Sequence, residues 1–291
     1  MKQKPALNLE EQVELLKQRG LVIDDDDMAV KYLYDTNYYR LTGFARQFQR
    51  DPRHGNNAFH SGTSLAMLAD LAETDARFGR VLAHALAAIE CTVRSRLALH
   101  LALEHGETAF YLRTDTYVAG LDDKVADLIE SIGRELRRDK GRTIARYAPD
   151  REDLSAVPIW VASEVLSFGT VSRLLELLRD PGTRDAVAES FSERRGKFVS
   201  TVHSLAVLRN RCAHHGQIWH RPLTIQTPVD GRHRKRAGVP FSDNGPFPAV
   251  LAIQRLLAHI SGGRECSEAL DLFIEAAPSR YMEGILKPDP K

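Results

Sequence analysis

The chain has 291 residues, of which 43% are hydrophobic and 27% are charged, so it can bury a sizeable core and lies outside the disordered and collagen-like classes. Lys and Arg (40) nearly balance Asp and Glu (39). Global charge therefore gives no argument for a nucleic-acid partner, and local clusters must carry that case. We expect one large helical domain or two coupled ones.

The sequence gives no sign of export or membrane insertion. Its first residues, MKQKPALNLEEQ, lack an apolar run followed by a small-residue cleavage site, and no window approaches the roughly 20 apolar residues of a membrane span. We therefore expect a cytoplasmic protein with no membrane partner. Cys91, Cys212 and Cys266 show no C-x-x-C spacing, which argues against a disulfide framework or a cysteine zinc site and predicts small buried side chains.

Apolar residues recur at helical spacing nearly throughout, and alternating strand patterns are hard to find, so we predict an all-α fold. Asn8 followed by Glu11 predicts an N-cap with a capping acid, for a helix over 9–19 that Gly20 closes. The acidic run at 24–27 indicates the start of a second helix, because carboxylates stabilise the positive end of the helix dipole.

Residues 36–50, TNYYRLTGFARQFQR, combine aromatic side chains with three arginines, and a loop rich in Pro, Gly, Asn and Ser follows. A long helix is expected over 64–104. It places Glu90 and Arg94 at i,i+4 on one face of an apolar segment. The pair either braces two helices as a structural ion pair or forms the second wall of a cleft.

The rest of the chain predicts further helices around a polar loop. We expect a polar helical segment, a helix that Pro158 starts and that kinks or breaks at Gly169, two more helices, a loop rich in Pro and Gly, and a final pair. In chain order these cover 122–146, 158–178, 184–195, 197–214, 226–248, 248–260 and 267–277. We divide the chain into an N-terminal helical segment (1–60) packed on the core, a helical core (61–225), and a loop with C-terminal helices (226–291).

The sharpest signal lies in LAVLRNRCAHHGQIWHRPL, where Arg209 is followed after four residues by His214, with His215 directly behind it. This segment resembles the HEPN superfamily, whose ribonucleases carry an R-x4–6-H motif near the end of a helix, commonly with Asn after the Arg, as Asn210 is here. R-x4-H alone is a weak pattern. The resemblance extends to the Abi (abortive infection) family of the AbiD/AbiF group through NYYRLTGF at 37–44, DARFGRVLAHALAAIECTVRSRLA at 75–98 and VPIWVASEVLSFGTVS at 157–172.

The resemblance implies an HEPN-like helical bundle with additional N- and C-terminal helices, and an endoribonuclease of bacterial phage defence. RNA supplies its own nucleophile, the 2′-hydroxyl, so cleavage to a 2′,3′-cyclic phosphate needs proton transfer and charge stabilisation, and neither a metal nor a cofactor. Histidine can transfer protons near neutrality, and arginine presents a charged fork to phosphate oxygens. We assign His214 to proton transfer and Arg209 to the phosphate. Asn210 is assigned a supporting role, and His215 is the alternative residue for proton transfer. Glu90 and Arg94 are expected to support Arg209 and His214 without contacting the substrate.

Five residues rotate a helix by about 140°, so Arg209 and His214 are poorly placed to converge on one phosphate from one helix. HEPN ribonucleases as a class pair two domains, so that two motifs line one cleft. A single motif in this chain therefore implies a homodimer. The expected partners are an RNA substrate, a second copy of the chain, and an inhibitory RNA or protein that restrains a toxic nuclease.

Other interpretations stay open. Arg209 and His214 could form a buried polar network at a helix end, in a catalytically silent module that binds RNA or a protein, or in an antitoxin-like scaffold. A zinc site from His214, His215 and His220 is disfavoured, because adjacent helical histidines point about 100° apart and no fourth ligand is near in sequence. Basic clusters could follow an RNA backbone or form solvated faces; they lie at 134–146 and at Arg232, Arg234, Lys235 and Arg236.

Overall fold

The computed structural model describes residues 6–106 and 109–290, and within these ranges the chain forms fourteen α-helices and one small two-stranded sheet. The predicted all-α class is confirmed. None of the described helices has both the length and the apolar character needed to cross a membrane.

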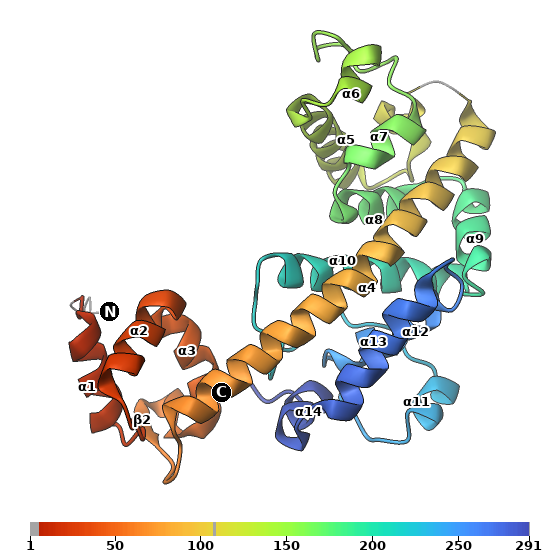
Figure 1. The fold of residues 1–291 in the computed structure, drawn as a ribbon. Helices are drawn as coiled ribbons and strands as arrows, with labels where there is room; N and C mark the ends of the chain where they lie inside the picture. Colours follow the sequence, from red (N-terminus) through yellow and green to blue (C-terminus); the bar gives the residue numbers. More distant parts are fainter. Residues whose placement is uncertain (1–5, 107–108, 291) are drawn as a thin grey trace.

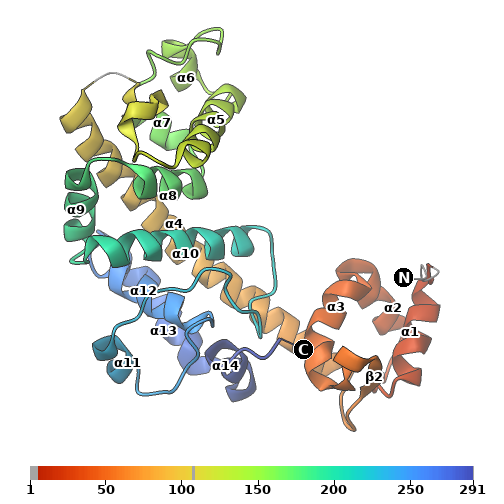
Figure 2. The ribbon, with the colours of Figure 1, turned by 180° about the vertical axis from the view of Figure 1, so that it is seen from behind.

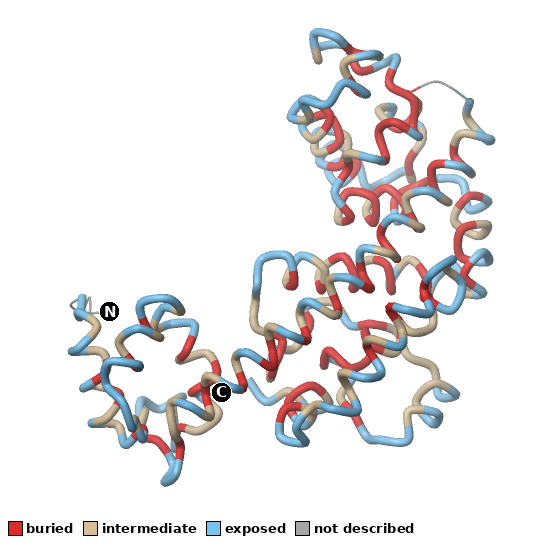
Figure 3. The backbone as a smooth tube through the Cα atoms, viewed as in Figure 1, coloured by how far each residue is buried: buried red, intermediate tan, exposed pale blue. Residues whose placement is uncertain are grey.

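The long helix α4 (Leu65–His105) is the axis of the molecule and runs diagonally through it (Figure 1). Ser64 caps its N-terminus by accepting a hydrogen bond from Met67 N–H at 3.2 Å. Buried residues recur along α4 from Leu68 to Leu101 (Figure 3). Because helices α3, α7, α8, α9, α10, α12 and α13 all pack on α4, this one element connects parts of the chain that are far apart in sequence.

The N-terminal segment forms its own hydrophobic cluster at one end of α4. It contains α1 (Leu9–Gln18), α2 (Asp26–Thr36), α3 (Tyr38–Ala45) and a hairpin of β1 (Gln49–Asp51) and β2 (Asn56–Phe59). The capping box of Asn8 and Glu11 is present as predicted, and Asp25 caps α2. The hairpin was not predicted, since its strands are too short to show an alternating pattern. The division at residue 60 stays a prediction, because α4 contributes Leu68 to this cluster and Leu71 to the main core.

A second group of helices covers the other end of α4 and consists of α5 (Asp122–Arg138), α6 (Arg142–Tyr147) and α7 (Ile159–Val165). The segment predicted over 122–146 is thus two helices. The helix predicted from Pro158 breaks before Gly169, at Ser167, and α8 (Phe168–Leu177) begins there. Ser167 Oγ caps Thr170 N–H at 3.2 Å, and Glu135 of α5 accepts a hydrogen bond from Ser167 N–H at 2.6 Å. This double cap sets the break.

The remaining helices surround the middle of α4. They are α9 (Pro181–Ser190), α10 (Arg195–Ala213), α11 (Gly231–Ala237), α12 (Phe247–Leu257), α13 (Gly263–Ala276) and α14 (Ser279–Leu286). Two were not predicted. Helix α11 lies inside the expected loop, where Asp230 caps His233 N–H at 2.9 Å, and α14 turns the expected final pair into three helices.

The end of the described chain returns to the N-terminal segment (Figure 2). Gln47 Nε2 donates to Asp289 O at 2.5 Å, and Arg53 Nη2 donates to Pro290 O at 2.7 Å. Of the three cysteines, Cys212 and Cys266 are buried as predicted. The prediction was wrong for Cys91, which is exposed because it lies on the outward face of α4.

Candidate active site at the end of helix α10

The R-x4-H motif occupies the last turns of α10. On the inner face of this helix, Leu205, Leu208 and Cys212 are buried in the main core and fix its rotation. Asn210 and His214 are exposed, whereas Arg209 is partly buried. The helix therefore presents Arg209 on a different side from His214, as the spacing predicts.

Arg209 is held by a carboxylate of α4. Its Nε donates to Glu90 Oε2 at 2.9 Å, and the other Glu90 oxygen pairs with Arg94. Arg94 Nη1 also donates to Glu164 O of α7 at 3.2 Å. Glu90 is only 5% exposed, so one buried carboxylate connects the predicted Glu90–Arg94 pair directly to the motif arginine and braces three helices.

The cluster of Glu90, Arg94 and Arg209 combines one negative and two positive charges, so its formal charge is +1 when all three are ionised. The bond to Glu90 uses Arg209 Nε. Of its terminal nitrogens, Nη1 lies 3.5 Å from Asn210 Oδ1, at the limit of a hydrogen bond. A half-exposed guanidinium with an anchored Nε and a residual positive charge can bind an anion such as phosphate.

His214 and His215 terminate α10 in a Schellman motif. His215 N–H donates to Cys212 O at 3.0 Å and Gly216 N–H donates to Arg211 O at 2.8 Å. His215 occupies the left-handed position, with φ of 53°, which favours glycine or asparagine. In the part of the chain that the structure describes, the His214 ring makes no hydrogen bond and is not joined to Arg209.

The residues after the motif are fixed by a buried aspartate that sequence reasoning missed. Asp75 of α4 accepts hydrogen bonds from Ile218 N–H at 3.0 Å, Trp219 N–H at 2.8 Å and the Tyr281 hydroxyl at 2.8 Å. Burial raises the pKa of Asp75, although these bonds and Arg40 partly oppose the shift. One signal could have revealed it, since Asp75 stands at helical spacing within the apolar stripe of Leu71, Phe78 and Leu82.

Helix α3, which carries the NYYRLTGF block, docks on the end of α10. Arg40 Nη1 donates to His215 O at 3.0 Å. Gly43 faces Gln217 so closely that an added Cβ would lie 2.5 Å from Gln217 Oε1. A cavity of about 170 Å³ remains between the two segments, lined by Tyr39, Arg40, Gly43, Phe44, His215, Gln217 and Arg221.

The four basic residues predicted for RNA contact lie on α11. Arg234 pairs with Asp243, and its guanidinium lies 4.3 Å from the centre of the Phe241 ring, so it contributes to local packing. Arg232, Lys235 and Arg236 are exposed. Among the described residues none of the four is hydrogen-bonded to Arg209 or His214, and their contact with RNA stays a prediction.

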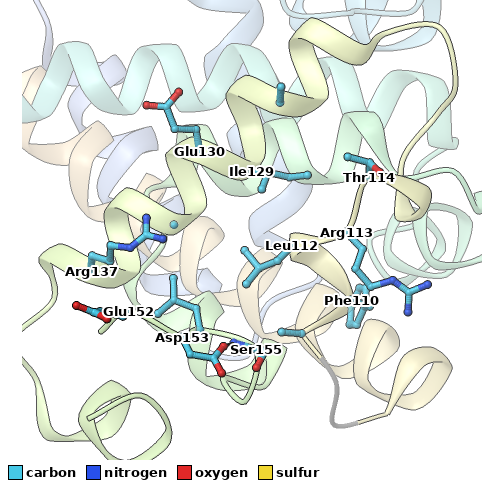
Figure 4. Close-up of a pocket in the computed structure, with 14 residues that line it drawn as sticks. Phe110, Leu112, Arg113, Thr114, Ile129, Glu130, Arg137, Glu152, Asp153 and Ser155 are labelled. Atoms are coloured by element: carbon cyan, nitrogen blue, oxygen red, sulfur yellow. Dashed lines mark hydrogen bonds between the residues drawn. The ribbon is translucent and has the colours of Figure 1, made fainter. Parts of the chain in front are cut away.

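His220 packs the exit from the motif, as its Nδ1 accepts a hydrogen bond from Asp289 N–H at 3.0 Å. Across 6–106 and 109–290, no three His, Cys, Asp or Glu side chains are grouped so that they could hold a metal ion. A larger cavity of about 820 Å³ lies between α5 and the segments before and after it (Figure 4). Its lining mixes Phe110, Leu112 and Ile129 with charges of both signs, and it is separate from the motif.

The comparison with protein families matches residues 31–220 to the family described as Abi-like protein. This range is well over half of the chain and contains α3, α4, α7, α8 and the whole of α10 with Arg209 and His214. No curated protein and no solved structure matches the chain significantly. The family profile thus covers the helices that build the candidate site and leaves α11 to α14 outside, and the chain belongs to the Abi-like protein family.

Proposed function

We propose that this chain is a metal-independent endoribonuclease of the HEPN superfamily that acts in bacterial abortive infection, with Arg209 and His214 as its active-site pair. The observation that carries the proposal is the anchoring of Arg209 by the buried Glu90 at 2.9 Å beside exposed histidines at the end of the same helix. Family membership supports the link to abortive infection. The nuclease activity rests on the chemistry of these side chains.

The proposed reaction uses the substrate's own nucleophile. The 2′-hydroxyl oxygen attacks the adjacent phosphorus, the bond from phosphorus to the 5′-oxygen breaks, and the products are a 2′,3′-cyclic phosphate and a 5′-hydroxyl. A proton leaves the 2′-hydroxyl and another reaches the 5′-oxygen. A histidine imidazole can perform either transfer, and we assign this role to His214. Arg209 stabilises the charge that develops on the phosphoryl oxygens.

We further propose that the active form is a symmetric dimer with residues 205–215 of both copies at or beside the two-fold axis. The outer face of α10 supports this arrangement, because a stripe at alternating spacings of four and three residues is exposed or only half-buried. Its members are Gly196, Ser200, His203, Val207, Asn210 and His214. A second copy packed on this stripe would bring the two His214 rings to one cleft, which a single chain cannot do.

The test is cleavage of single-stranded RNA by the full chain with EDTA present, followed by analysis of the product ends. We expect cleavage with 2′,3′-cyclic phosphate ends. His214→Ala should lower the rate by about 10²- to 10⁴-fold, Arg209→Lys should lower it substantially because lysine lacks the fork, and His215→Ala should be milder.

Activity that disappears on chelation and returns with a divalent ion would exclude the metal-independent mechanism. Loss of cleavage in His215→Ala alone would move the proton transfer to His215. If all three variants cleave normally, the motif is structural and the chain is a binding module. A stable monomer with full activity, measured by light scattering at micromolar concentration, would exclude the dimer.

A further inference from the structure

The cavity between α3 and the chain after α10 has the features of an anion site. Two of its seven lining residues are the arginines Arg40 and Arg221, and none is acidic. Its volume of about 170 Å³ corresponds to several water molecules, at about 30 Å³ each. It can therefore hold a phosphate group with part of its sugar, and it is too small for a folded partner.

The two arginines differ in what they already bind. Arg40 is anchored through Nη1 to His215 O at 3.0 Å, so it also closes the end of α10. Within the described residues the guanidinium of Arg221 donates no hydrogen bond, and the residue is exposed. Arg211 donates to the backbone oxygens of Arg221 and Pro222 at 3.2 and 3.1 Å, which fixes the backbone that carries Arg221. The structure thus fixes the backbone that carries a guanidinium which, across residues 6–106 and 109–290, donates no hydrogen bond to the protein.

The cavity also touches the proposed active site. His215, which lines it, directly follows His214 and keeps the unfavourable left-handed backbone at φ of 53°. Strained residues of this kind concentrate at functional sites. Tyr39, which also lines the cavity, is 79% exposed, and its ring lies perpendicular to that of Tyr38 at 5.9 Å between ring centres. Most of this aromatic side chain is therefore accessible to stack on a base.

We infer that this cavity is a subsite for the RNA strand, in which Arg221 and Arg40 hold a backbone phosphate next to the scissile one and Tyr39 stacks on the adjoining base. This inference rests on the proposed function, because it assumes that the strand continues past His214. It assigns to the NYYRLTGF block the binding of substrate, beyond its packing role.

The experiment measures binding separately from cleavage. The ligand is a fully 2′-O-methylated RNA oligonucleotide, which lacks the nucleophile and cannot be cut, and its affinity for the full chain is measured by fluorescence anisotropy at several salt concentrations. Arg221→Ala removes one phosphate contact. We expect roughly tenfold weaker binding and a slope of log K against log salt that is smaller by about 0.7, the value for one contact on a single strand.

Each of the two cavity variants, Arg221→Ala and Tyr39→Ala, has a matched control. Arg50→Ala removes an exposed arginine of the N-terminal segment that does not line the cavity, and it should leave affinity and slope unchanged.

Tyr39→Ala should weaken binding at least about fivefold with an unchanged slope, since stacking releases no counterions. Tyr34→Ala removes a tyrosine with the same exposed fraction, 79%, outside the cavity, and should have no effect. Circular dichroism and thermal midpoints verify that all four variants fold.

Binding by Arg221→Ala with wild-type affinity and slope overturns the subsite, even if the wild type cleaves RNA. If Arg221→Ala and Arg50→Ala lose RNA affinity equally, the loss reflects the general positive charge of the protein, and the subsite is also overturned. Inorganic phosphate is tested alone by calorimetry, and a site that binds it in an Arg221-dependent way without any effect on RNA would be a free-phosphate site, contrary to the inference. A wild type that cleaves nothing but binds RNA through Arg221 and Tyr39 would refute the proposed nuclease and leave the subsite standing.

Discussion

Replacing Glu90 by glutamine tests whether this residue positions Arg209. The substitution keeps the shape and helix propensity of the side chain and removes its charge. Glu90 receives Arg209 on one oxygen and Arg94 on the other. In the variant one of these oxygens becomes an amide nitrogen that faces a guanidinium, donor against donor, so at least one arginine loses its partner.

The stability cost follows from how exposed each pair is. The side chains of Glu90 and Arg94 are 7% and 16% exposed, and loss of a hydrogen bond between charged groups at such a site costs about 2 kcal/mol. Arg209 is 37% exposed, so solvent screens its pair and we add at most about 1 kcal/mol. Denaturant unfolding should therefore show Glu90→Gln to be less stable by about 2–3 kcal/mol.

The effect on cleavage should be larger than a loss of stability explains. Because a glutamine amide has one acceptor oxygen for two guanidinium groups and carries no charge, it holds Arg209 less firmly relative to the phosphate, and misplacement of a positioning group costs up to about 10²-fold in rate. We expect kcat to fall by about 10- to 100-fold. The KM should stay level or decrease, because removal of the negative charge of Glu90 makes the cluster more positive and so favours binding of the negatively charged RNA. In combination with Arg209→Lys the substitution should add little, since both act through one interaction.

The control is Glu193→Gln. Glu193 pairs with Arg255 Nε at 2.8 Å, and the two side chains are 12% and 15% exposed, so the pair is as buried as Glu90–Arg94 but lies away from the motif. It should lose about 2 kcal/mol of stability with normal cleavage. Wild-type cleavage by a folded Glu90→Gln, or an equal loss of cleavage in Glu193→Gln, would refute the positioning role.

Three further predictions concern backbone strain, pH dependence and thiol reactivity. His215→Gly should raise the free energy of unfolding by about 0.5–1 kcal/mol, because glycine adopts the left-handed position freely; a less stable variant in denaturant titration would contradict this. Burial raises the pKa of Asp75 in the folded chain. Protonation of Asp75 therefore adds to the free energy of unfolding at a pH below the pKa that Asp75 has in the unfolded chain, and this contribution is lost as the pH rises through its pKa in the folded chain. Asp75→Asn should therefore have a lower free energy of unfolding than the wild type, and the difference between the two should decrease above about pH 4. A difference that increases with pH would show that burial is not the main influence on the pKa of Asp75. A maleimide should label one thiol of the native chain in mass spectrometry, at the exposed Cys91, whereas Cys212, whose pKa burial raises to about 12, and Cys266 are buried; rapid labelling of Cys212 would disprove its native burial.

Local signals in the sequence predicted much of the fold. The capping box of Asn8 and Glu11 and the acidic start of α2 each depend on residues within one helical turn, so they can be predicted without the structure. A kink or break at Gly169 was predicted, but its exact position at Ser167 could not be, because half of the cap comes from Glu135, which is 32 residues away. Helix α14 was missed for a similar reason, since its buried Tyr281 is anchored to Asp75 of α4.

The candidate site shows the same limit. Sequence reasoning found Arg209, His214, Glu90 and Arg94 as motifs, and i,i+4 spacing is enough to pair Glu90 with Arg94. The bond from Arg209 to Glu90 joins residues 119 positions apart, and only the packing of α10 on α4 creates it. Arg40 and His215, which are hydrogen-bonded, are 175 positions apart in the chain, and no local sequence pattern predicts their contact.

The buried network around Asp75 affects when the site can form during synthesis. Trp219, which follows the motif, is 1% exposed and stacks on Phe44 and Phe48, but one wall around it comes from α14. Gly284 lies so close that an added Cβ would meet Trp219 Nε1 at 2.3 Å, and Tyr281 shares Asp75 with the Trp219 backbone. The ribosome makes α14 after the motif helix, and domains generally fold as units once their parts are available. A nascent chain that already contains Arg209 and His214 therefore lacks the packing that fixes the segment after them. This order delays completion of the candidate site until α14 has been synthesised.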